Sequence, residues 1–355
     1  MTTPAARYEP VAFAGLPGWA GDDHLAAFWA FCGSAAAVIA SPGRPEALAQ
    51  SCERALADAP QIVTRQQAQA FFEAAFRPMR VVHANPAGLL TGYYEPVLDG
   101  SLTPTAQFAV PLYRRPADLE NVVAESERGA KSASGPTHVR RTPTGTEPYA
   151  TRQQIEEGAL DGLGLELCYL AGPVDTFFLH VQGSGVIGLP DGQQMRVTYD
   201  GKNGHPYTSI GRTLVEDGTF NLDEITLQVL GDWLRADPVR ARPILWRNAS
   251  FVFFRELKAD SAIGVLGTAL HVGRSLAVDT AFHALGAPIY VTAPGMTHVA
   301  PEGLNRLMIA HDVGSAIKGP ERGDIYFGTG PEALALAGIT KHAGHFFVLQ
   351  PMGVP

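Results

Sequence analysis

The stretch AHDVGSAIKGPERGDIYFG, residues 310–328, places two carboxylates, Asp312 and Asp324, on either side of a Gly/Pro turn. The apolar run that precedes Asp312, residues 307–310, predicts a buried strand. A carboxyl group at the end of a buried strand is partly desolvated, which raises its pKa, and a nearby carboxylate raises it further. Because a carboxylic acid that stays protonated near neutral pH can donate a proton to a leaving group, Asp312 is a candidate general acid. The alternative is an Asp that only caps a turn.

The composition is typical of a globular protein of about two domains. The chain has 355 residues, of which 46% are hydrophobic and 17% charged, and its 38 Gly and 27 Pro favour a sheet-rich architecture with many turns. The formal net charge is −8 without a basic block, so we expect no nucleic-acid partner. No apolar run has the length of a membrane span, and the first 13 residues show no signal peptide.

Hydrophobic spacing divides the chain into regions. The first 78 residues predict helices, because apolar residues recur every three or four positions. Residues 79–98 then change to a strand-like pattern. Residues 175–183 (DTFFLHVQG) and 194–201 predict strands, residues 222–236 predict one amphipathic helix, and the chain from residue 250 onward predicts mostly strands and tight turns.

Further residues are candidates for a ligand site. Asp279 is a third aspartate in a strand-and-turn context, although spacing alone does not bring it to Asp312 and Asp324. Glycines beside Gln and Asn amides predict a groove for a polar ligand, whereas a simple hairpin would explain the glycines alone. Strand alternation sends adjacent Tyr side chains to opposite faces, so one could stack on a sugar. These groove candidates are Tyr93, Tyr94, Gln182, Gly183, Ser184, Gly185, Lys202, Asn203, Gly204 and Tyr207.

Three other patterns do not support a cofactor, a metal or a hydrolase triad. Residues 328–333 match a dinucleotide-binding pattern, but too little chain follows for the remaining βαβ units, so Pro331 is interpreted as the first residue of a helix. His342 and His345 have no third ligand nearby, and we expect no metal and no cofactor. Ser275, His311 and Asp312 lack a G-x-S-x-G elbow, and His311 would point away from its strand neighbour Asp312.

With these motifs in place, the chain resembles the membrane-bound lytic murein transglycosylase A family with its C-terminal three-aspartate (3D) domain. The matching segments run in order across most of residues 90–351. They are LTGYYEPVLDGS (90–101), EPYATRQQIEEGAL (147–160), TFFLHVQGSGVIGLPDG (176–192), NGHPYTSIG (203–211), NASFVFFRE (248–256), GRSLAVD (273–279), RLMIAHDVGSAIKGPERGDIYFGTG (306–330) and HFFVLQP (345–351). His311 and Ser315 stand where many relatives would have Gln and Gly.

The resemblance implies a mainly β fold. It implies a double-psi β-barrel built from residues 1–104 and 247–355, with N-terminal helices, and a smaller inserted β domain at residues 105–246 that forms the other wall of a glycan groove. Asp312 would be the sole catalytic acid and base, supported by Asp279 and Asp324. The groove residues that the resemblance carries over are Tyr93, Tyr94, Gln182, Gly183, Ser184, Gly185 and Asn203.

The implied function is that of a lytic transglycosylase. Such an enzyme would cleave the β-1,4 bond between N-acetylmuramic acid and N-acetylglucosamine in peptidoglycan and leave 1,6-anhydro ends. We expect the periplasmic side of a Gram-negative envelope as its location. Outer-membrane attachment and protein partners in wall remodelling stay open. A hydrolytic glycosidase on a similar barrel and a non-catalytic peptidoglycan-binding module are the alternatives.

Overall fold

The computed structural model describes residues 6–85, 87–123 and 136–353. The chain divides into two compact units. The first contains residues 1–93, 263–328 and 340–355, and the second contains residues 94–262 and 329–339. The second unit therefore extends beyond the predicted insertion at 105–246 and also takes in a helix from the C-terminal third. Among the described residues, no helix combines the length and the apolar character needed to cross a membrane.

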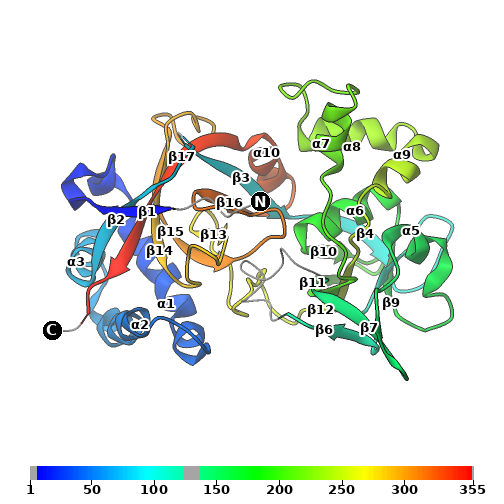
Figure 1. The fold of residues 1–355 in the computed structure, drawn as a ribbon, viewed down its shortest axis with the longest axis horizontal. Coiled ribbons are helices and arrows are strands. Elements are labelled where there is room, and N and C mark those ends of the chain that lie inside the picture. The colour runs from blue at the N-terminus through cyan, green and yellow to red at the C-terminus, as the bar shows by residue number, and fades with distance from the viewer. Residues whose placement is uncertain (1–5, 86, 124–135, 354–355) are drawn as a thin grey trace. The chain divides into compact units, whose positions relative to one another are not determined.

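The first unit consists of an N-terminal helical layer and a large sheet (Figure 1). Its helices are η1 (Phe13–Gly15), η2 (Trp19–Gly21), α1 (His24–Ala40), α2 (Glu46–Asp58), η3 (Ala59–Gln61) and α3 (Arg65–Ala75). Its strands are β1 (Arg7–Pro10), β2 (Phe76–Val82), β3 (Gly88–Glu95), β13 (Ser275–Val278), β14 (Pro288–Ala293), β15 (Leu304–Asp312), β16 (Arg322–Thr329) and β17 (Lys341–Pro351). The helices predicted for the first 78 residues are therefore present, although this span also contains β1 and the start of β2.

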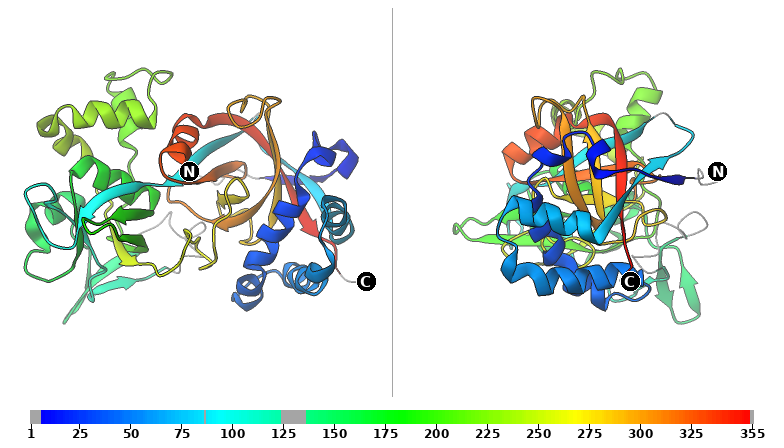
Figure 2. Two further views of the ribbon diagram at one scale, coloured as in Figure 1. Left: turned by 180° about the vertical axis from the view of Figure 1, so that it is seen from behind. Right: turned by 90° about the vertical axis from the view of Figure 1, so that its left-hand side faces the viewer.

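The sheet of the first unit joins the two ends of the chain. Its strand order is β1-β2-β17-β14-β15-β13-β16-β3, and β17 also pairs with β3. The long strand β17 is hydrogen-bonded to β2 along one part of its length and to β3 along another. The helices α1, α2 and α3 pack on this sheet, as Figure 2 shows, through a core that includes Phe28, Phe72, Tyr290 and Ile309. Burial of these apolar faces fixes the strands that carry the candidate acid.

The second unit combines two sheets with a group of short helices. Its strands are β4 (Val97–Ser101), β5 (Val110–Tyr113), β6 (Leu119–Asn121), β7 (His138–Thr142), β8 (Gly145–Glu147), β9 (Glu166–Leu170), β10 (Ser184–Gly188), β11 (Gln194–Lys202) and β12 (Val252–Glu256). Its helices are α5 (Arg152–Gln154), η5 (Ile155–Ala159), α6 (Pro173–Gln182), α7 (Ile210–Glu216), α8 (Leu227–Arg235), α9 (Pro238–Leu245) and α10 (Pro331–Ile339). The sheets have the orders β12-β11-β10-β4-β9-β5 and β6-β7-β8.

The predicted strand at residues 175–183 is wrong, because this segment is the helix α6. Its aromatic and branched residues suggested a strand, but Val174, Phe177 and Phe178 follow helical spacing and are all buried. Pro173 occupies the first turn, and Gly183 ends the helix with a left-handed φ of 82°. The structure confirms the mainly β class, the strand β11 and the helix that begins at Pro331. The helix α8 (Leu227–Arg235) is shorter than the helix predicted at residues 222–236.

Candidate active site

The candidate acid, Asp312, is the last residue of β15. The preceding residues 307–310 are fully buried, as the apolar run predicted, whereas the Asp312 side chain itself is half-buried. Its Oδ1 accepts a hydrogen bond from the backbone N–H of Val313 at 2.9 Å. The rigid strand therefore holds a partly accessible carboxyl group at its end.

A tyrosine hydroxyl holds the second oxygen of this carboxyl. Tyr93, on β3, donates its O–H to Asp312 Oδ2 at 3.0 Å, and its ring lies 5.3 Å from that of Tyr326. Burial raises the pKa of the Asp312 carboxyl to about 6, while the hydrogen bonds from Val313 and Tyr93 act in the opposite direction. Asp312 can therefore exist both as an acid and as a carboxylate near neutral pH.

Asp324 lies on the same face of the sheet as Asp312. Both residues are in register with Ala277 of the intervening strand β13. Thr91 donates its hydroxyl to Asp324 Oδ1, and burial raises the pKa of this carboxyl although Arg322 opposes the rise. The negative charge of Asp324 in turn helps to raise the pKa of Asp312.

Asp279 has a different environment. Its Oδ1 accepts the backbone N–H of Ala281 at 3.1 Å, and its Oδ2 accepts that of Gly319 at 2.9 Å. The side chain is buried. Asp279 therefore ties the loop between β15 and β16 to the end of β13. Its direct partners are backbone amides, so its support for Asp312 would act through the loop.

Ser275 and His311 are in contact but do not form a hydrolase triad with Asp312. Ser275 Oγ lies 2.7 Å from His311 Nδ1, and the other ring nitrogen faces Ser34. Both Ser275 and His311 are fully buried. Asp312 instead contacts Tyr93 and Val313, because neighbouring side chains on a strand point to opposite faces.

In the second unit, the predicted groove residues surround the junction of α6 and β10. Gln182 is the last residue of α6, and its Oε1 accepts the backbone N–H of Tyr94 at 3.1 Å. Gln182, Gly183 and Ser184 are half-buried, whereas Tyr94 and Gly185 are buried. A Cβ on Gly185 would lie 2.5 Å from Leu179 Cδ1 and 3.3 Å from the carbonyl oxygen of Pro96, so a side chain here would force the buried Leu179 to shift.

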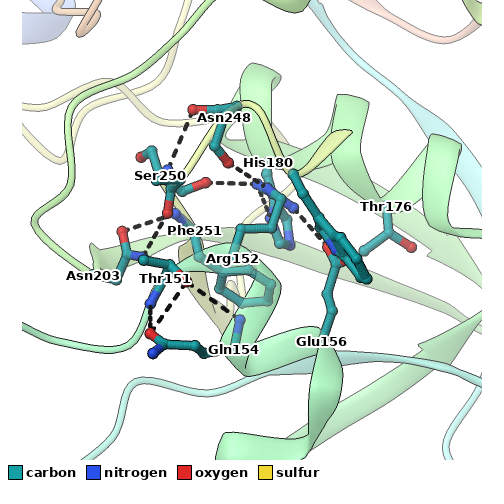
Figure 3. Close-up of polar contacts among 12 residues, drawn as sticks. Thr151, Arg152, Gln154, Glu156, Thr176, His180, Asn203, Asn248, Ser250 and Phe251 are labelled. Carbon is teal, nitrogen blue, oxygen red and sulfur yellow. Dashed lines mark hydrogen bonds and ion pairs between the residues drawn. The ribbon is translucent and has the colours of Figure 1, made fainter. Parts of the chain in front are cut away.

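Asn203 is a predicted contact that is almost completely buried. It is 1% exposed, and its Nδ2 donates to the carbonyls of Ala150 and Ala249, both at 2.8 Å. Its Oδ1 accepts the N–H of Phe251 at 2.9 Å (Figure 3). The amide therefore binds three backbone groups in two segments of the chain, and this geometry does not leave it pointing toward a ligand.

A buried arginine organises the same region, as Figure 3 shows. Arg152 donates to the carbonyls of Asn248 and Ser250 and contacts His180 Nδ1 at 3.1 Å. Its guanidinium also lies 4.8 Å from the ring of Phe177 on α6. Burial lowers the pKa of Arg152 and holds the pKa of His180 well below its ordinary value, so the ring of His180 is neutral. This cluster fixes α6 and hence the backbone at Gln182.

Thr91 was missed by the sequence reasoning, as was the cluster around Arg152. Thr91 precedes Tyr93 by two positions, so strand alternation alone could have assigned both side chains to one face. The cluster joins segments about 30 and 100 residues apart, which no local pattern shows. In the described part of the chain, no group of three or more His, Cys, Asp or Glu side chains is arranged to hold a metal ion. His342 stacks on His298 instead, and His345 faces Glu321.

Comparison with known proteins identifies the family. The family model described as the MltA specific insert domain matches residues 89–255, and the 3D domain model matches residues 274–350. The membrane-bound lytic murein transglycosylase A of Vibrio cholerae is 33% identical over 267 residues. That alignment covers 74% of this chain and 65% of the relative, so the chain matches less than two thirds of the relative's length.

Solved structures extend the similarity to the whole chain. The membrane-bound lytic murein transglycosylase from Agrobacterium tumefaciens is 35% identical, with a TM-score of 0.85 and 97% coverage of both chains. The Escherichia coli MltA structure with bound chitohexaose is 26% identical, with a TM-score of 0.71 and coverage of 99% of this chain and 95% of that one. The chain therefore belongs to the membrane-bound lytic murein transglycosylase A family.

Proposed function

We propose that this protein is a lytic transglycosylase that cleaves the β-1,4 bond between N-acetylmuramic acid and N-acetylglucosamine in peptidoglycan. The observation that carries the proposal is the Asp312 carboxyl, which is half-buried, bound by Tyr93 and Val313, and has its pKa raised to about 6. Family membership supports this reaction, because the relatives are named for it.

The reaction needs one group that first gives and then takes a proton. Protonated Asp312 donates its proton to the bridging oxygen as the glycosidic bond breaks, and charge like that of an oxocarbenium ion develops at C1. The carboxylate that remains is stabilised by the Tyr93 hydroxyl and the Val313 N–H. It then removes the proton from the muramoyl 6-hydroxyl, whose oxygen closes on C1. The product is a 1,6-anhydro sugar, no water is consumed, and Asp312 is protonated again.

A hydrolytic glycosidase is the competing proposal, because Asp324 could serve as a second carboxylate. Asp312 and Asp324 are two strands apart, so their backbones are separated by about 10 Å. An inverting hydrolase places its carboxyl groups roughly 6.5–9.5 Å apart. Asp324 is, however, bound by Thr91 and lies near Arg322, an arrangement suited to electrostatic support of Asp312. The two proposals differ in whether water enters the product.

The proposed glycan contacts follow from exposure. Tyr93 beside Asp312, and Gln182, Gly183 and Ser184 in the second unit, are partly accessible and are proposed to touch the sugar chain. Tyr94, Gly185 and Asn203 are buried, and we assign them to packing that supports those contacts. The bound chitohexaose in the E. coli relative supports an N-acetylated oligosaccharide as the ligand class.

Finer features of the fold and location are also proposals. The pairing of β17 with both β14 and β3 supports a double-psi β-barrel in the first unit, with residues 105–246 as the core of an inserted domain. The names of the relatives support attachment to a membrane, for which we propose the periplasmic face of the outer membrane. Fractionation of cells that express the full-length protein would test this location.

The Asp312→Asn variant tests the proposed role of Asp312. The amide is nearly isosteric but cannot donate the acid proton, so release of soluble fragments from purified peptidoglycan should fall by about 100-fold or more. Asp191→Asn is a matched control, because Asp191 accepts the N–H of Gln193 in an exposed turn, and it should retain wild-type turnover. Turnover of Asp312→Asn within about tenfold of wild type would contradict the assignment.

A further inference from the structure

A buried chain of hydrogen bonds passes directly behind Asp312. His311, the preceding residue of β15, points into the first unit and is fully buried. Its Nδ1 lies 2.7 Å from Ser275 Oγ, and its Nε2 lies 3.0 Å from Ser34 Oγ. Ser34 belongs to α1 and Ser275 to β13. One side chain therefore joins a helix and a neighbouring strand through the backbone that carries the candidate acid.

The groups at the two ends of this row of hydrogen bonds indicate the direction of each bond. Ser275 Oγ accepts the backbone N–H of His271 at 2.8 Å, so the Ser275 hydroxyl proton is free to point to His311 Nδ1. At the other end, the Ser34 hydroxyl donates to the carbonyl of Phe31 at 3.2 Å, so its oxygen can accept the N–H of His311 Nε2. The ring is thus held as the neutral tautomer with its proton on Nε2.

The surroundings oppose any other state of the ring. Burial lowers the pKa of His311 to about 3, and the neighbouring His271 acts in the same direction. A protonated ring would turn Nδ1 into a donor, so the Ser275 hydroxyl proton would have to turn away from it and would lose its acceptor. The neutral ring lets both serine hydroxyls keep an acceptor, and the backbone of Ala30 in α1 is a further hydrogen-bond partner of the ring.

The same strand end also positions the loop that contacts Asp312. A Cβ on Gly264 would lie 2.3 Å from the carbonyl oxygen of His311, so this loop is seated directly on the strand. The next residue, Val265, provides a backbone hydrogen bond to the Asp312 carboxyl. Movement of the backbone at His311 would therefore disturb both the direction of Asp312 and its hydrogen bonds.

We infer that His311, held by Ser34 and Ser275, is a positioning residue that fixes the end of β15 and the direction in which Asp312 presents its proton. The inference rests on the proposed function of Asp312. Proton transfer is sensitive to such geometry, because a displacement of about 1 Å can lower the rate by about 100-fold. The N-terminal helix α1 thereby contributes to the reaction without touching the substrate.

Variants at each of the three positions test this inference on the full chain with purified peptidoglycan. His311→Leu removes both ring hydrogen bonds, while Ser34→Ala and Ser275→Ala each remove one. We expect kcat to fall by about fivefold or more and KM to stay within about twofold. His311→Gln keeps one acceptor and one donor in a side chain of similar length, so it should recover most of the lost kcat.

The pH dependence of kcat distinguishes a residue that positions Asp312 from one that only stabilises the fold. If Asp312 loses backbone N–H donors, its carboxylate is less stabilised, and the pH at which kcat falls on the basic side should rise. Ser51→Ala is the matched control, because Ser51 is a buried serine of α2 that bonds to the carbonyl of Ala47 in its own helix. This control should keep wild-type kcat and pH dependence even if the melting temperature falls.

The outcomes separate this inference from the proposed function. The positioning role is overturned if Ser34→Ala and Ser275→Ala both keep wild-type kcat and if the pH at which their kcat falls on the basic side is unchanged. This outcome does not depend on whether His311→Leu folds. Asp312→Asn is included in the same assay. If it is inactive while the serine variants behave as wild type, only the positioning role fails. If Asp312→Asn keeps its activity, the proposed function fails instead.

Discussion

The hydrogen bond from Tyr93 to Asp312 gives a prediction that can be worked in numbers. Tyr93→Phe keeps the ring but removes the hydroxyl that stands 3.0 Å from Asp312 Oδ2. A hydrogen bond to a charged group is worth about 1.5–3 kcal/mol, and one pKa unit corresponds to about 1.4 kcal/mol. Because Asp312 is only half-buried, water replaces part of the loss, and we take the lower end of this range. The pKa of Asp312 should therefore rise by about one unit from about 6.

This shift in the pKa of Asp312 should move the fall of kcat to higher pH. Asp312 must be protonated to act, so wild-type kcat should fall as the pH rises through about 6. In Tyr93→Phe the fall should occur near pH 7. At pH 7.5 the protonated fraction would be about 3% in the wild type and about 24% in the variant, from a one-unit shift. Relative to its own maximum, the variant should thus be the more active form on the basic side.

The assay is the pH dependence of kcat on purified peptidoglycan, measured between pH 4 and 9. Tyr8→Phe is a matched control, because the Tyr8 hydroxyl bonds to the carbonyl of Phe282, away from Asp312, and its profile should equal that of the wild type. If the pH at which kcat falls in Tyr93→Phe is the same as in the wild type, or lower, then Tyr93 does not lower the pKa of Asp312 as inferred here.

Other predictions concern stability. Burial raises the pKa of Asp312 above its ordinary value of 3.8, so the stability that this residue contributes is present below pH 4 and is lost as the pH rises through about 6. Asp312→Asn should therefore be more stable than wild type at pH 8, by up to about 3 kcal/mol in denaturant titrations, and equal to it at pH 4. Asn203→Ala should lower the free energy of unfolding by about 2–4 kcal/mol because three backbone groups lose their partner, whereas the exposed Asn221→Ala should change it little. Gly183→Ala should cost about 1 kcal/mol because the residue has a φ of 82°, and an unchanged melting temperature would contradict this.

Much of the first unit follows from local patterns in the sequence. Apolar spacing placed α1, α2 and α3, and the run before Asp312 predicted a buried strand that ends at a carboxylate. These predictions succeed because helix and strand periods act over a few residues. The relation of Asp312 to Asp324 could not be predicted from spacing, since it depends on the register of both strands with Ala277 of β13.

The wrong strand prediction in the second unit has a physical explanation. Residues 175–183 combine aromatic and branched side chains, which favour a strand locally, but packing on α8 and α9 and the ends at Pro173 and Gly183 select a helix. The contacts of Asn203 could not be predicted from the sequence either, because an amide suits both a sugar and buried backbone groups. Its partners come from Ala150, Ala249 and Phe251, about 50 residues away in the sequence, and only the folded chain brings them together.

The central claim is that Asp312 closes a 1,6-anhydro ring instead of activating water. Mass analysis of the fragments released from purified peptidoglycan tests it most directly, with digestion in ¹⁸O-labelled water as an internal check. We expect muropeptides one water lighter than hydrolysis products, with no ¹⁸O incorporated, and we expect these products to disappear in Asp312→Asn. Products that carry one ¹⁸O at the new reducing end would contradict the account and identify the enzyme as a hydrolase.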